Sequence, residues 1–138
     1  MMKELIRNLL AALAGALTGI FLLTASQVLA AVYHPLPAGI DPKDTVAMGE
    51  FIANAPVTAL LIMIAGYFVS VAAASWVAGR MSAHGHVRQA LMVGGLFLVA
   101  SLIHLRTFPH PAWFWAANLG AVFAGTWVGI KLLPKRTA

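Results

Sequence analysis

Four long segments of this chain carry no charged side chain, and they constrain its fold more than any other feature. They cover residues 8–40, 51–79, 89–105 and 107–130. About 20 apolar residues in a helix cross a bilayer core, and a charge at its centre costs about 2.5 kcal/mol or more. The pattern predicts an all-α integral membrane four-helix bundle, with spans at about residues 5–33, 56–81, 87–105 and 112–133.

Composition predicts that residues 1–138 form a single transmembrane domain. The chain is 61% hydrophobic and 9% charged, whereas a soluble domain has about 25% charged residues. A chain of this length cannot bury so much apolar surface in its own core, so lipid must solvate it. Cysteine is absent, which excludes thiol redox chemistry and thiolate metal sites. The first apolar segment is longer than the roughly 7–15 residues of a signal peptide, which predicts an uncleaved span.

The distribution of charge predicts the orientation of the spans. If the N-terminus is cytoplasmic, seven of the nine basic residues lie inside, and only Lys43 and Arg106 lie outside. Short loops follow the positive-inside rule, so both termini are predicted to be cytoplasmic. The basic residues occur at span ends without forming a basic face, so we expect no nucleic acid partner. The inner set comprises Lys3, Arg7, Arg80, Arg88, Lys131, Lys135 and Arg136.

Small residues recur at four-residue spacing within three of the predicted spans. Such rows allow helix backbones to approach closely, which matters in lipid because apolar contact alone drives little association. Two interpretations follow: packing within the bundle, or a docking face for a second copy or another membrane protein. The residues are Gly15 and Gly19, then Gly66, Ser70 and Ala74, then Ala121, Gly125 and Gly129.

The segment between the first two spans, residues 34–54, contains a helix-start signal. Asp41 suits the N-cap, Pro42 the first helical position, and Asp44 the positive end of the dipole. A short helix lying on the membrane surface is therefore predicted. Its apolar face would comprise Val46, Ala47, Phe51 and Ile52.

Three histidines, His34, His104 and His110, fall near the predicted outer face and are the main candidates for chemistry. Imidazoles with nearby carboxylates can bind zinc or another divalent metal, and His34 and His104 could hold a haem between two helices. The spacing matches no metal-binding signature. The simpler interpretation is that these histidines bond to headgroups and loop carbonyls, so no cofactor is predicted.

Few other side chains within the spans can support chemistry. Gln27 and Asn118 are expected to form interhelical hydrogen bonds. Ser101 and His104 lie one helical turn apart, but no carboxylate accompanies them to complete a catalytic set. The chain has no glycine-rich phosphate loop. We therefore expect no enzymatic activity.

Two loop motifs carry a resemblance to a known group. Residues 33–44 read YHPLPAGIDPKD, and residues 109–114 read PHPAWF. They resemble the Y-x-P-x-P-x-G-x-D-x-x-D and P-H-P-x-W-F patterns of a group of small bacterial four-span membrane proteins. The resemblance implies a four-helix membrane fold but no activity, so no catalytic residue carries over. The matching positions are Pro35, Pro37, Gly39, Asp41 and Asp44, then Pro109, Pro111 and Trp113.

These motifs lead to a hypothesis about the outer end of the bundle. Residues 34–54 would form an ordered cap, packed on the turn at residues 109–111 and covered by Trp113 and Phe114. The leading functional prediction is a structural or accessory subunit of the bacterial inner membrane. It would bind membrane lipids, a second copy or a membrane-protein partner. The alternatives are a small-molecule transporter that works as an oligomer, and an outer-facing metal or haem site.

Overall fold

The computed structural model describes residues 1–135 and is all-α. This confirms the all-α part of the predicted fold class. Arg136, one of the basic residues assigned to the inner side, lies outside the described residues. The helices are α1 (Met2–Tyr33), α2 (Thr45–Ala53), α3 (Val57–Met81), α4 (His86–Thr107) and α5 (Ala112–Lys131).

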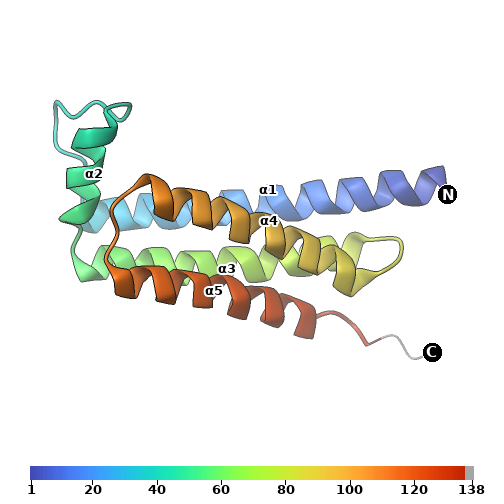
Figure 1. Ribbon diagram of the computed structural model, residues 1–138. Helices are drawn as coiled ribbons and strands as arrows, with labels where there is room; N and C mark the ends of the chain where they lie inside the picture. The colour runs from blue at the N-terminus through green and yellow to red at the C-terminus, as the bar shows by residue number, and fades with distance from the viewer. Residues whose placement is uncertain (136–138) are drawn as a thin grey trace.

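The four long helices run side by side, and α2 crosses one end of them (Figure 1). We call this the α2 end; the α4–α5 turn also lies there. The N-terminus, the α3–α4 turn and the end of α5 lie at the opposite end, which we call the terminal end (Figure 1). An even number of long helices thus brings both ends of the described chain to the same side of the bundle.

Three helices, α1, α3 and α4, are long and apolar enough to cross a membrane. The fourth long helix, α5, has 20 residues, which is about 30 Å at 1.5 Å per residue. Three tryptophans and Asn118 lower its mean hydropathy. An indole counts as slightly polar in a hydropathy scale although it suits the edge of a bilayer.

Helix α3 is the centre of the bundle and contacts α1, α4 and α5. Its buried residues include Tyr67, Val71, Ala74 and Ala78, which pack with Val93 and Phe97 of α4 and with Ala121 and Val122 of α5. The core is therefore built from small and medium side chains around one helix. The large apolar residues of α1, such as Leu13, Leu17 and Phe21, are instead exposed.

The small residues lie where α3 meets its neighbours. Gly15 of α1 faces Ala74 and Ala78, and Gly19 faces Ala74 and Phe97. On α5, Gly125 lies against the backbone of Phe68 and Ala72, and Gly129 against that of Ala72 and Trp76. Gly66 faces Ser26 of α1, and Ser70, Ala74 and Ala121 are buried. The rows are thus occupied by contacts within the chain, and the exposed surface consists of other residues.

The structure corrects how α2 begins and which face it turns inward. Asp44, not Asp41, is the N-cap: its Oδ1 accepts from the backbone N–H of Val46 at 3.0 Å and of Ala47 at 3.1 Å. The Asp41 carboxylate instead accepts from the N–H of Lys43 at 2.9 Å in the preceding turn. Pro42 therefore lies before the helix. The sequence prediction chose the wrong cap because Asp41 and Asp44 are three residues apart and aspartate is a favoured N-cap residue at either position.

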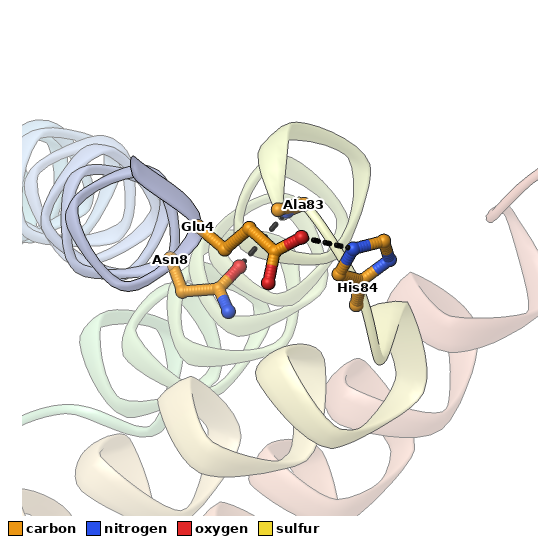
Figure 2. A network of polar contacts seen from close by, with 4 residues as sticks. All are labelled: Glu4, Asn8, Ala83 and His84. Atoms are coloured by element: carbon orange, nitrogen blue, oxygen red, sulfur yellow. Dashed lines mark hydrogen bonds and ion pairs between the residues drawn. The ribbon is translucent and has the colours of Figure 1, made fainter. Parts of the chain in front are cut away.

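Polar contacts join the start of α1 to the α3–α4 turn at the terminal end (Figure 2). The Asn8 side-chain oxygen accepts from the N–H of Ala83 at 2.8 Å, and Glu4 lies 2.9 Å from the His84 ring. The buried Gln89 donates to the Asn8 carbonyl at 2.6 Å. The exposed Glu4–His84 pair contributes little, so the amide contacts of Asn8 fix the register of α1 at this end.

We predict that Gly125→Ala destabilises the bundle while Gly120→Ala, in the same helix, does not. A Cβ at Gly125 would lie 2.7 Å from the Phe68 carbonyl oxygen, whereas one at Gly120 meets nothing within 4 Å. Backbone cannot yield as a flexible side chain does, so the cost should be about 1–3 kcal/mol. The control should be neutral or slightly stabilising, since alanine favours helix by up to about 1 kcal/mol. Tryptophan fluorescence during thermal unfolding in detergent measures both, and equal unfolding temperatures would contradict the assigned contact.

Candidate functional site

A pocket of about 270 Å³ lies at the α2 end, between α2 and the bundle. All five helices or the turns beside them contribute to its lining, and we call it the α2 pocket. Most of its surface is apolar, and its polar groups are three imidazoles and one amide. The lining residues are Gln27, Ala30, Ala31, His34, Met48, Phe51, Ile52, Ala55, Ala59, Leu60, Met63, His104, His110 and Phe114.

The pocket exists because α2 does not pack closely on the bundle. No close backbone contact joins α2 to another helix in the described part of the chain. Side chains hold it instead: the rings of His34 and Phe51 stack with centroids 4.0 Å apart. Gly49 is buried and faces Pro109 of the α4–α5 turn. Met48, Phe51 and Ile52 line the gap, so the inward face of α2 includes Met48 and not the predicted Val46, which is exposed.

His34 follows α1 directly and connects it to α2. Its Nε2 lies 2.9 Å from the Phe51 carbonyl oxygen. A carbonyl only accepts, so Nε2 carries the hydrogen in this contact. In the neutral ring Nδ1 is then an acceptor without a hydrogen.

His110 lies between Pro109 and Pro111 in the α4–α5 turn. Its Nδ1 lies 3.0 Å from the Phe108 carbonyl oxygen, so Nδ1 carries the hydrogen. Its ring stacks on Phe114 at 4.7 Å between centroids. Burial lowers the pKa of His110, and the bond to the Phe108 carbonyl offsets part of this by raising it. His110 is therefore neutral at pH 7, and its Nε2 is an acceptor.

His104, in the last turn of α4, completes the group. Its ring centroid lies 5.2 Å from that of His110 and 5.4 Å from that of Phe108. Two predicted site residues, His104 and His110, are thus neighbours, and His34 lines the same pocket from α1.

The three histidines share a pocket but do not form a metal site. Within residues 1–135, no group of three or more His, Asp or Glu side chains has a metal-binding arrangement. The Nε2 of His34 is engaged with a backbone carbonyl, so only its Nδ1 is left as a possible ligand atom. The sequence placed these imidazoles at the same end of the bundle, and two of them contact loop or helix carbonyls, as the simpler interpretation expected. Spacing alone could not reveal which nitrogen is bonded.

Below the pocket the core is closed. Leu60, Leu105 and Phe114 form a buried cluster. One turn further along α5, Asn118 donates to Ser101 Oγ at 2.5 Å, and both side chains are fully buried. Asn118 thus forms the interhelical bond expected of it, and Ser101 is paired with an amide and not with His104. Gln27 is exposed at the edge of the pocket and forms no interhelical bond in the described residues.

The remaining motif residues do not line the pocket. One part of the predicted cap, its cover by Trp113 and Phe114, is corrected. Pro35, Pro37, Gly39, Asp41 and Asp44 belong to an exposed turn, in which Gly39 has φ +99°. Pro109 contacts α2 itself, and Pro111 is the N-cap of α5. Trp113 is 43% exposed, while Phe114 is buried in the core. Neither ring covers the loop; α2 and the Pro109 turn close this end.

The sequence prediction missed the pocket and most of its apolar lining. Met48, Phe51, Ile52 and Ala55 follow an i, i+3, i+4, i+7 pattern, which is the signal of a buried helix face. This pattern predicts that the face of α2 with these four residues turns toward the bundle. The gap itself depends on how far α2 stands from α3 and α5, and no local pattern records that distance.

Comparison of the chain with protein-family models, with characterised proteins and with solved structures gave no match. The fold and the site therefore define the class: an all-α protein with at least three helices suited to a membrane and an apolar, histidine-lined pocket at one end. Function has to be argued from that pocket and from the surface of the bundle.

We predict that the protein loses thermal stability as the pH falls below about 6.5, the ordinary pKa of histidine. Because burial lowers the pKa of His110 in the folded state, the unfolded chain binds more protons below that pH, and acid favours unfolding. The imidazoles of His104 and His34 line the same pocket. His110→Phe should therefore reduce the fall in unfolding temperature between pH 8 and pH 5, as measured by tryptophan fluorescence. His84→Phe, at the terminal end, is the control; an identical pH profile for His110→Phe and the wild type would contradict the prediction.

Proposed function

We propose that this chain is a small four-span protein of the bacterial inner membrane that serves as a structural or accessory subunit and binds a membrane lipid in the α2 pocket. The pocket carries the proposal: it is concave, mostly apolar and has a few convergent polar groups, the usual features of a small-molecule site. Its lining contains no nucleophile paired with a base in the described residues, which favours binding over catalysis.

The four-span topology rests on the arrangement of α5. This helix runs alongside α3, its glycines are in contact with the α3 backbone, and no charge occurs between residues 107 and 130. In this topology α2 lies in the plane of the outer surface, and the α2 end faces outward. The described basic residues then gather at the terminal end, apart from Lys43 and Arg106, as the positive-inside rule requires.

The exposed face of α1 supports a second part of the proposal, contact with a membrane partner or another copy. Leu13, Leu17, Ile20 and Phe21 are each more than half exposed. The small residues of the four-residue rows are already used inside the bundle. A partner would therefore pack on large side chains of α1, where lipid tails compete with it.

Cysteine labelling tests the topology, because the chain has no cysteine of its own. We expect Thr107→Cys and Lys43→Cys to react with a membrane-impermeant maleimide in intact spheroplasts. Lys135→Cys should react only after the membrane is opened. All three side chains are exposed in the fold, so access depends on the side of the membrane. Reaction of Thr107→Cys and Lys135→Cys from the same side would show that α5 does not cross.

Native mass spectrometry after purification in mild detergent tests the binding function. We expect the protein to carry a lipid, and Ala31→Trp, which fills the α2 pocket from α1, to lose it. Ala116→Trp is the matched control, since Ala116 is exposed on α5 and outside the pocket lining. A partner or second copy on α1 would persist in both variants. A bare monomer from native membranes would overturn the proposal, and equal lipid on all three proteins would remove the pocket from it.

A further inference from the structure

The hydrogen-bonding state of the α2 pocket specifies what its ligand must offer. His34 and His110 each donate their one hydrogen to a backbone carbonyl, of Phe51 and Phe108 respectively. A neutral imidazole has one donor and one acceptor, so each ring is left with an acceptor nitrogen. A ligand group that meets these nitrogens must donate a hydrogen bond. His104 forms no side-chain hydrogen bond within residues 1–135, so it can donate as well as accept.

The charge of the lining excludes ionic headgroups. Among the described residues, no Lys, Arg, Asp or Glu lines the pocket. A carboxylate or phosphate would lose its hydration without gaining a cation, and an ammonium group would lack a carboxylate. Such unpaired burial is costly. The headgroup must therefore be neutral.

The remaining lining determines the rest of the ligand. Leu60 and Met63 of α3 and Ala30 of α1 present apolar surface beneath the histidines. The volume of about 270 Å³ exceeds the roughly 150 Å³ that holds a benzene molecule. The pocket therefore has room for a small head and the first part of an alkyl chain, while the rest of a long chain would extend into the surrounding lipid.

We infer that the α2 pocket binds a neutral amphiphile whose head is a hydroxyl, which donates to the free nitrogen of His110 or His34 and accepts from His104. This inference rests on the lipid-binding function proposed above and specifies its ligand class. A hydroxyl is the simplest neutral group that both donates and accepts. An ether of the same size can only accept, and it would leave the imidazole nitrogens unpaired.

Competition photolabelling tests the head chemistry directly. The full chain in lipid nanodiscs is labelled with a photoreactive ten-carbon alcohol, and the modified residues are located by mass spectrometry. Competitors are decanol, decyl methyl ether, decanoate and decyltrimethylammonium, compared at equal membrane concentration. We expect labelling at pocket residues such as Met48 and Met63, and decanol should compete about fivefold to tenfold better than the ether, the usual effect of one net hydrogen bond.

A variant pair separates the hydrogen bond from structural damage. His110→Phe keeps a ring that can stack on Phe114 but removes the acceptor. It should weaken decanol about fivefold and leave decyl methyl ether unchanged, since the ether has no hydrogen to donate. A general loss of packing would weaken both. His84→Phe, the same change at the terminal end, should alter neither.

Each outcome decides between the inference and the function on which it rests. Equal competition by alcohol and ether inside the pocket would overturn the hydroxyl head and leave lipid binding intact. Stronger competition by decanoate or the ammonium would overturn the neutral head. Labelling that avoids the pocket would overturn both. If alcohol is preferred, 1-oleoylglycerol and geranylgeraniol as competitors identify an acylglycerol or an isoprenoid alcohol as the source, and either result supports the shared chemistry.

Discussion

Close approach of helix backbones around α3 is the constraint on which the rest of the structure depends. Gly15 and Gly19 bring α1 against one side of α3, and Gly125 and Gly129 bring α5 against another. In lipid, such close packing replaces the hydrophobic effect as the main source of helix association. The large apolar side chains are consequently released to face outward on α1. The small side chains at the contacts of α3 thus allow the helices to pack closely, and they leave the large apolar side chains of α1 on the surface.

The two ends of the bundle are held together by different contacts. At the terminal end, the side chain and carbonyl of Asn8 bond to Ala83 and Gln89, so α1 is held directly to the α3–α4 turn (Figure 2). At the α2 end, the connection between α1 and α3 is long and contains a helix. There the imidazoles satisfy backbone carbonyls of α2 and of the α4–α5 turn. The same bonds fix the tautomers that give the α2 pocket its acceptor character, so a structural requirement of the turns produces the chemistry of the site.

Much of this fold could be predicted from the sequence, for identifiable reasons. Charge-free segments place the four long helices within a few residues, because a charge inside a span is so costly. Small-residue rows at fourfold spacing anticipate the Gly15 and Gly125 contacts, although they could not say whether the partner was the same chain. The details of the α2 pocket were harder to predict. The choice of Asp44 over Asp41 as the N-cap is local, but both residues suit a cap. The inward face with Met48 follows a local pattern that the prediction read in another register. The bonded nitrogen of His34 and the gap beneath α2 depend on distances between separate elements.

The way α2 is attached has a consequence for the thermodynamics of the pocket. This helix has nine residues, too few to be stable alone, and it lacks close backbone contact with the other helices in the described chain. It is held by the His34–Phe51 stack and by Pro109 against Gly49. Local unfolding begins where such contacts are fewest. We therefore expect α2, which borders the pocket, to open more readily than the four packed helices. A molecule bound beneath it and the order of α2 must stabilise each other by the same free energy.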